Sequence, residues 1–359
     1  MAKKKSGQTS AVKKSILKLD QQLLKLINER AQIVKDASEG DAQIDIQLHL
    51  KNTDFEALSK QNKGPIHENS LHAIYREVES GCRAISSQQK VAYLGPQFSY
   101  SHQAAIERFG QCADLVPVAT IAAVFEEIDR NQADFGLVPV ENSNDGRVTD
   151  TLDMFAKLPV KICGEVQLHI HHNLLAMCQR AEIKEVYSKP QAISQCRNWL
   201  AKHLPQAKLC EMTSTAAAAQ LAAKKPGIAA IASRAAGINY QLNTVAANIE
   251  DNQHNVTRFA VIGHQTGKRT GDDKTTLMFQ LEHKPGALAD AMTIFKRHKL
   301  NLTWIESFPL PGKGKEYLFF VEMQGHQNDL KLRKAIASLE KKSVRLDTLG
   351  SYQNTEPIE

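Results

Sequence analysis

A change in the spacing of apolar residues near residue 90 limits how this chain can fold. Before that point Val12, Ile16, Leu19, Leu23 and Leu26 recur at alternating intervals of four and three residues, which is the spacing of a helix–helix seam. After it, short apolar runs alternate with amphipathic stretches. This switch predicts a helical domain followed by separate domains that contain β-sheets, and therefore a multidomain α/β chain.

Residues 11–88 are predicted to form the all-α domain. Two further helical stretches cover residues 54–58 and 69–85, and Gly64 and Pro65 break the chain between them. Residues 1–10 are polar and basic, and no apolar segment follows them. We therefore predict a disordered leader there, and not a secretory signal.

Residues 89–265 are predicted to form a doubly wound α/β domain, because short apolar runs alternate with amphipathic stretches. The length of this segment and a central pair of long strands suggest two lobes with a cleft between them, similar to a periplasmic binding protein. The expected strands cover residues 91–94, 115–118, 135–140, 162–170, 185–187, 208–211, 228–231 and 258–262. The expected helices cover residues 101–109, 121–130, 149–157, 191–203 and 215–224. Residues 274–353 then follow a β-α-β-β-α-β pattern, which predicts a ferredoxin-like module.

The composition excludes several classes of protein. Lys+Arg 45 and Asp+Glu 39 leave a net charge of only +6, and aromatic residues make up 6% of the chain, so a nucleic-acid-binding surface is not indicated. No apolar run approaches the ~18 residues of a membrane helix. The six cysteines include no C-x-x-C pair, which favours a cytoplasmic protein without disulfides or structural zinc. An anionic small molecule is a sufficient partner for this charge.

Polar side chains follow several of the expected strands, at the edge where α/β sheets bind ligands. They are Ser99, Ser101, Glu141, Asn142, Ser143, Ser188, Gln195, Thr257 and Arg258. Spacing alone favours ordinary polar turns, but four such turns together indicate one polar cleft. Among His169, His171 and His172, the pair His169 and His171 has no nearby set of acidic or cysteine partners, so we predict a pair of surface or half-buried histidines and no metal site.

At these same positions the sequence resembles the prephenate dehydratases. The resemblance rests on residues 93–96 with 99–102, 138–143, 187–191 with 195–196, and 255–259, in the order of the family. Residues 284–288 and 306–309 resemble the ACT domain of that family. Residues 19–20 and 26–30 resemble the chorismate mutase domain that many bacterial members carry.

The resemblance implies a decarboxylating dehydration of prephenate to phenylpyruvate, in L-phenylalanine biosynthesis, with no cofactor or metal. It implies that Thr257 supplies the catalytic hydroxyl, together with Glu141 and Asn142. Ser99, Ser101, Ser143, Ser188, Gln195 and Arg258 would bind the substrate. Lys189 and Phe308 stand where the family usually has His and Arg.

In the ACT module the resemblance implies an L-phenylalanine effector site. Its residues in this chain would be Gly286, Ala287, Leu288, Glu306 and Ser307. Feedback regulation through this site is therefore expected, although Phe308 leaves its strength open.

In the helical domain Lys13 and Arg30 match cationic positions of the mutases. Asp41 stands where a lysine is expected, and an aspartate 4 Å from a dianionic substrate is repelled by roughly 1–4 kcal/mol. We therefore predict weak or absent mutase activity, with the helices forming a homodimer or homotetramer. The alternatives are a bifunctional mutase–dehydratase, a dehydratase that prefers arogenate, and a non-catalytic regulator that binds aromatic compounds.

Overall fold

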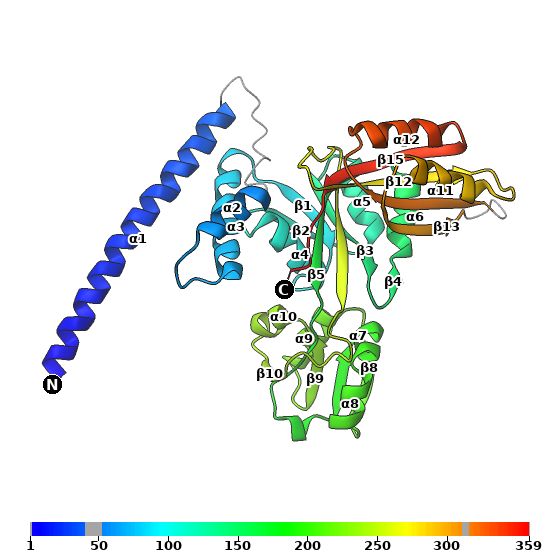
Figure 1. Ribbon diagram of the computed structural model, residues 1–359. Helices are drawn as coiled ribbons and strands as arrows, with labels where there is room; N and C mark the ends of the chain where they lie inside the picture. Colours follow the sequence, from blue (N-terminus) through cyan, green and yellow to red (C-terminus); the bar gives the residue numbers. More distant parts are fainter. Residues whose placement is uncertain (1, 40–51, 311–315, 359) are drawn as a thin grey trace. The chain divides into compact units, whose positions relative to one another are not determined.

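The computed structural model describes residues 2–39, 52–310 and 316–358. It divides the chain into two compact units (Figure 1). The first unit contains residues 1–89 together with residues 109–114, and the second contains residues 90–108 and 115–359. The boundary at residues 89 and 90 lies beside the predicted end of the helical domain, but residues 109–114 of the predicted α/β domain group with the helices, and the two predicted β-containing domains form one unit.

The first unit is built on three helices, α1 (Ala2–Glu39), α2 (Asn52–Gln61) and α3 (Glu68–Ser86). All three were expected, and α1 is a single unbroken helix (Figure 1). Residues 2–10, predicted to be a disordered leader, instead form its first turns. Because the chain has no proline before Pro65, no residue here prevents helix formation.

The apolar seam of α1 is largely exposed to solvent. Val12, Ile16, Leu19, Leu23 and Leu26 have exposed fractions of 53–64%. A regular apolar stripe on a helix normally packs against another helix. The seam in this chain is therefore a surface that a partner would bury.

The second unit begins with a lobe around a mixed sheet. The sheet order is β2-β1-β3-β11-β5, and β4 pairs with β3. The strands are β1 (Lys90–Leu94), β2 (Asp114–Val118), β3 (Phe135–Asn142), β4 (Gly146–Arg147), β5 (Lys161–His169) and β11 (Val256–Gly263). The helices of this lobe are α4 (Tyr100–Phe109), α5 (Ile121–Asp129) and α6 (Thr149–Lys157). Its core includes the buried side chains of Phe125, Phe155 and Ile262.

A second lobe is inserted between β5 and β11. Its sheet order is β10-β6-β9-β7-β8. The strands are β6 (Asn173–Ala176), β7 (Glu185–Ser188), β8 (Lys208–Glu211), β9 (Ile228–Ala232) and β10 (Asn243–Ala246). The helices are the 3₁₀ turn η1 (Arg180–Glu182), α7 (Pro190–Gln195), α8 (Arg197–His203), α9 (Thr215–Ala222) and α10 (Arg234–Asn239). The helix expected over residues 191–203 is thus interrupted at Cys196, and β4, β6, β10 and α10 were not expected.

The two lobes are joined by two segments of chain. The first crossing segment, residues 170–172, leads from β5 to β6, and the second, residues 247–255, returns from β10 to β11. This return makes the sheet of the first lobe mixed and not purely parallel, because β11 runs antiparallel to both β3 and β5. The parallel pairs that a doubly wound sheet predicts are β1–β3, β7–β8 and β7–β9.

The remaining residues form a C-terminal module with the expected β-α-β-β-α-β order. It contains β12 (Asp273–Leu281), α11 (Ala287–Arg297), β13 (Leu302–Pro309), β14 (Tyr317–Gln324), α12 (Leu330–Glu340) and β15 (Ser343–Gln353). The antiparallel sheet order β13-β14-β12-β15 is that of a ferredoxin-like unit. Beyond it, Ile358 makes a parallel bridge to Leu168 of β5. In the described part of the chain no helix is both long and apolar enough to cross a bilayer.

Candidate active site

The pairing of β3 with β11 sorts the polar residues of both strands onto two faces. Thr257 lies opposite Asn142, and Arg258 lies opposite Glu141. Directly opposed side chains of an antiparallel pair point to the same face, and successive side chains point to opposite faces. One face therefore carries Thr257 with Asn142, and the other carries Arg258 with Glu141.

Thr257 and Asn142 are in direct contact. The Asn142 Nδ2 atom donates to the Thr257 hydroxyl oxygen at 2.8 Å, and also to Asn255 Oδ1 at 2.8 Å. A hydroxyl has one proton to donate besides the lone pairs with which it accepts. With its oxygen accepting from an amide, Thr257 is left to donate its own proton, and hydrogen-bond cooperativity strengthens that donation.

The turn after β3 holds Asn142 in place. Its side-chain oxygen accepts from the backbone N–H groups of Asn144 and Asp145, at 3.0 and 3.1 Å, as in an Asx turn. Ser143 ties this turn to β11, because its hydroxyl accepts from Val256 N at 3.0 Å and donates to the His254 carbonyl at 3.2 Å. The predicted site residues Asn142, Ser143 and Thr257 thus lie together.

Gln195, at the end of α7, brings the second lobe to the same site. Its Oε1 accepts from Asn255 Nδ2 at 3.0 Å, and its Nε2 donates to Asp145 at 3.2 Å. Asn255 is only 1% exposed. Gln195 was among the predicted residues, whereas the direct roles of Asn255 and Asp145 as its partners were not foreseen.

His172, in the first crossing segment, is a buried member of this network. Its Nε2 lies 2.8 Å from Gln195 Oε1, and its Nδ1 lies 3.2 Å from the Tyr100 hydroxyl. Gln195 Oε1 can only accept, so we assign the proton of a neutral ring to Nε2. Burial lowers the pKa of His172 and raises that of Tyr100, which favours the neutral form of both.

His172 was not part of the predicted pair of surface or half-buried histidines, and it is only 3% exposed. The neighbouring His171 is half-buried, as predicted, and its Nδ1 lies 2.7 Å from Glu250 Oε1. Glu250 also accepts from the His172 backbone N–H at 2.9 Å, so the second crossing segment is tied to the first. We call the two crossing segments, tied together in this way, the hinge. The sequence signal that could have revealed it is the position of His171 and His172 directly after a long strand.

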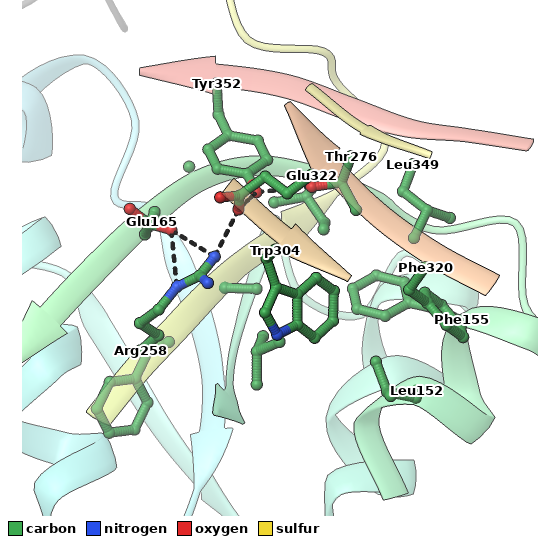
Figure 2. A pocket seen from close by; sticks show the side chains of 15 residues that line it. Leu152, Phe155, Glu165, Arg258, Thr276, Trp304, Phe320, Glu322, Leu349 and Tyr352 are labelled. Carbon is green, nitrogen blue, oxygen red and sulfur yellow. Dashed lines mark hydrogen bonds and ion pairs between the residues drawn. The ribbon is translucent and has the colours of Figure 1, made fainter. Parts of the chain in front are cut away.

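Arg258 and Glu141 lie on the opposite face of the first lobe's sheet and do not join this cluster. Figure 2 shows the Arg258 guanidinium between Glu165 of β5 and Glu322 of β14, beside Trp304. Its Nη1 also contacts Glu141 at 3.0 Å. Burial alone would lower the pKa of Arg258, but the carboxylates of Glu322 and Glu165 raise it. The structure thus corrects the prediction that Arg258 and Glu141 act in the cleft.

Three predicted serines lie elsewhere in the described structure, away from the pair of Thr257 and Asn142. Ser188 is completely buried in the second lobe, where its hydroxyl donates to the Ile231 carbonyl at 2.6 Å. Ser99 accepts from His102 N at 3.3 Å at the start of α4, and Ser101 is buried in the same helix. From this loop it is Tyr100 that reaches the hinge, through a 2.8 Å hydrogen bond to the His171 carbonyl.

The predicted effector residues occupy two places in the C-terminal module. Gly286 precedes α11 with a φ of 82°, a left-handed conformation that favours glycine, and Ala287 and Leu288 begin that helix. Glu306 and Ser307 lie on β13. Arg147 of β4 donates to Glu306 Oε2 at 2.7 Å and to the Ser307 carbonyl at 3.1 Å.

The two predicted mutase residues lie on α1 of the helical unit. Lys13 is exposed, whereas Arg30 is partly buried and has one guanidinium nitrogen 3.9 Å from Glu79 of α3. Its other terminal nitrogen is buried and has no hydrogen-bond partner among the described residues. Asp41 lies outside the described residues.

This chain is similar to known proteins along most of its length. The family model described as "Prephenate dehydratase" matches residues 91–267. A bifunctional chorismate mutase/prephenate dehydratase of Aquifex aeolicus is 40% identical over 349 residues, which cover 95% of this chain and 96% of that protein. One from Pseudomonas aeruginosa is 36% identical over 355 residues, covering 96% of this chain and 97% of the relative.

A solved structure is also similar to a large part of this chain. The prephenate dehydratase of Arthrobacter aurescens in complex with L-Phe is 32% identical, with a TM-score of 0.69, and the match covers 74% of this chain and 90% of that one. The sequence motifs, the two-lobed site and these relatives lead to the same assignment. The chain belongs to the prephenate dehydratase family.

Proposed function

We propose that this protein converts prephenate to phenylpyruvate, with Thr257 as the catalytic hydroxyl. The observation that carries the proposal is the 2.8 Å contact between Thr257 and Asn142. Asn142 ends β3, and Thr257 lies at the start of β11, directly after the second crossing segment. Family membership supports the reaction, and the contact supports the role of Thr257. The same membership makes a non-catalytic regulator the weaker alternative.

The reaction places a simple demand on these residues. The bond between the ring and its carboxylate breaks, carbon dioxide leaves, and that electron pair enters the ring as the ring hydroxyl departs. The departing oxygen needs a proton to leave as water, and the gain of aromaticity drives the step. A positioned proton donor typically contributes ~10²–10⁴-fold. Thr257 would hydrogen-bond the departing oxygen, while Asn142 holds the threonine oxygen and stabilises it as it gives up proton density.

The two lobes suit a cleft that closes around the substrate, as in a periplasmic binding protein. Supporting this are the two crossing segments and the Gln195 contacts to Asn255 and Asp145, which are hydrogen bonds with at most one charged partner. The cluster contains Thr257, Asn142, Ser143 and Gln195, and we add Asn255, Asp145 and His172 to it as positioning residues. The six cysteines, all free, fit the cytoplasmic location expected from the sequence.

We further propose that the C-terminal module is an ACT domain that binds L-phenylalanine through Gly286–Leu288 and Glu306–Ser307. The ferredoxin-like strand order supports the domain type. The similar structure of the Arthrobacter enzyme was solved with L-Phe, which supports the effector. Feedback inhibition of the dehydratase is the expected consequence.

Chorismate mutase activity is a second candidate function. The prediction of weak or absent activity remains untested, but relatives that match nearly the whole chain are called bifunctional. Arg30 adds an observation of its own, because it keeps a buried guanidinium nitrogen without a hydrogen-bond partner in the described structure. An anionic ligand would satisfy that donor.

Replacing Thr257 by valine keeps the shape of the side chain and removes its hydroxyl. We expect dehydratase turnover to fall by about 10²-fold or more, the lower end of the usual contribution of a general acid. Phenylpyruvate formation measures this directly, and Thr293→Val on the exposed face of α11 is the matched control. A loss of less than about tenfold would remove Thr257 from the proposed role.

Replacing Arg30 by glutamine tests the second function. If the mutase is active, the wild type consumes chorismate at an ordinary enzymatic rate of ~1–10³ s⁻¹, and Arg30→Gln lowers that rate at least tenfold while dehydratase activity is unchanged. Lys18→Gln, also on α1, is the control. A wild type that does not consume chorismate would show that the helical unit is not a mutase.

The neutral form of buried His172 gives stability a defined dependence on pH. Its pKa in the folded protein is lowered from 6.5, so below about pH 6.5 the unfolded chain binds a proton that the folded chain excludes. Folding stability contributed by His172 is therefore lost as pH falls below that value. We expect the midpoint of thermal unfolding of wild type to fall relative to His172→Gln between pH 7.5 and 5.5. The exposed His283→Gln serves as control, and an unchanged gap at both pH values would contradict the prediction.

The exposed seam of α1 should be the surface through which copies of the chain associate. We expect the wild type to have the mass of at least two chains by light scattering, and the double substitution Leu19→Lys with Leu23→Lys to lower that mass, because it places charges in an apolar contact. Gln21→Lys with Gln22→Lys adds the same charge to other positions of α1 and should not. A wild type with the mass of one chain would rule out this assembly.

A further inference from the structure

Arg147 is the point at which the C-terminal module touches the turn that carries the candidate active site. It lies on β4, the short return strand of the hairpin that begins at Asn142. Its Nη1 donates to Glu306 Oε2 at 2.7 Å and to the Ser307 carbonyl at 3.1 Å. Both acceptors belong to β13, the strand that holds half of the proposed effector site.

The hairpin of residues 142–147 makes three contacts that assemble the site. Asn142 donates to Thr257, Asn144 accepts from Asn252 of the second crossing segment at 2.8 Å, and Asp145 accepts from Gln195 of the second lobe. A displacement of this one hairpin would therefore disturb the catalytic hydroxyl, the hinge and the contact between lobes together.

The ion pair of Arg147 with Glu306 is more exposed than the Arg258 network, which also connects the first lobe with the C-terminal module. The side chains of Arg147 and Glu306 are 37% and 23% exposed, whereas those of Glu165 and Glu322, which bind Arg258, are 3% and 2% exposed. A partly exposed ion pair contributes little free energy and is readily exchanged, whereas breaking a buried network is costly. The Arg258 network is thus a permanent anchor, and the Arg147 contact is a reversible one.

An amino acid that binds at Glu306 and Ser307 needs the same two acceptors. Its α-ammonium group is a cation with three N–H donors, and a carboxylate beside a backbone carbonyl is the kind of site that takes such a group. Arg147 already occupies both of these oxygens. The ammonium group and Arg147 therefore compete.

We propose that Arg147 is the positioning residue through which the effector controls the reaction. The proposal rests on the function assigned above, in which an amino acid effector binds at Glu306 and Ser307. With Arg147 bound to β13, the hairpin is held in the position in which Asn142 meets Thr257. With the ammonium group on Glu306, Arg147 is released and the hairpin loses that support.

The sign of the effect follows from linkage. The effector favours the state in which the Arg147 contact is broken, and removal of Arg147 favours the same state without effector. A variant without this side chain should therefore bind prephenate more weakly and L-phenylalanine more tightly, because the coupling between two ligands is reciprocal. Since exposed ion pairs are weak, we expect changes of about two- to fivefold.

The test uses the full chain with three substitutions. Arg147→Ala removes the contact, and Arg147→Lys retains a cation able to reach the same acceptors. Arg345→Ala is the matched control, because Arg345 of β15 donates to the Ala156 carbonyl of the first lobe at 3.0 Å but does not touch the hairpin. Phenylpyruvate formation at varied prephenate, with and without L-phenylalanine, gives KM, kcat and the inhibitory concentration, and calorimetry gives the affinity for L-phenylalanine.

The proposal expects Arg147→Ala to raise KM for prephenate and to lower the inhibitory concentration of L-phenylalanine, each about two- to fivefold, with kcat within about twofold. Arg147→Lys and Arg345→Ala should resemble the wild type. The proposal would be overturned if Arg147→Ala had the same KM and the same inhibitory concentration as Arg345→Ala. Loss of L-phenylalanine binding would also overturn it, because Arg147 would then be a ligand and not a competitor, and so would collapse of kcat, because Arg147 would then act on the substrate.

Failure of the proposed function appears elsewhere in the same experiment. A wild type that forms no phenylpyruvate, or that does not respond to L-phenylalanine, contradicts the assigned function or its regulation. If the wild type forms phenylpyruvate and responds to L-phenylalanine, and the Arg147 variants behave like the wild type, only the role of Arg147 is contradicted.

Discussion

The antiparallel register of β3 against β11 is the constraint on which the rest of this structure depends. It sets Thr257 opposite Asn142 and Arg258 opposite Glu141. Because successive residues of a strand point to opposite faces, two adjacent pairs serve two purposes. One pair lies at the active-site face, and the other binds the C-terminal module. A shift of one residue would exchange them and destroy both arrangements.

The buried charges on the module face act as an anchor between catalytic lobe and C-terminal module. Lys274 contacts Glu165 at 2.8 Å, and Tyr352 donates to Glu322 at 2.8 Å. Burial alone would raise the pKa of Glu322, but Arg258 and Lys274 lower it, so this carboxylate remains charged. Removing one partner from such a network typically costs about 3–5 kcal/mol. The module is therefore held close to the strands that carry the proposed catalytic pair, and the more exposed Arg147 contact is the one available for the proposed regulation.

The hinge between the lobes is built mainly from neutral groups, in contrast to the buried charges that anchor the module. His172, Gln195 and Asn255 are joined by hydrogen bonds between neutral groups, with Glu250 and Asp145 at the edges of the network. Neutral hydrogen bonds each contribute only about 0.5–1.5 kcal/mol net. A joint of this kind keeps a defined geometry and can still open, which is what a cleft that admits a substrate and releases its product requires.

The sequence by itself determined the order of the helical and β-containing segments, and most of the strands and helices. Hydrophobic periodicity is a local property, so the seam of α1 and the β-α-β-β-α-β pattern could be recognised without coordinates. Motif resemblance also identified Thr257, Asn142, Ser143 and Gln195, which the structure brings together. Only the tertiary structure decided which face each neighbouring residue occupies, because that depends on strand pairing between segments more than a hundred residues apart. For this reason Arg258 and Glu141 were assigned to the cleft, although Arg258 binds Glu322 of the C-terminal module and Glu141 pairs with Arg258. For the same reason His172, Asn255 and Arg147 could be recognised only from the structure. His172 and Asn255 meet where the two crossing segments come together, and Arg147 contacts β13.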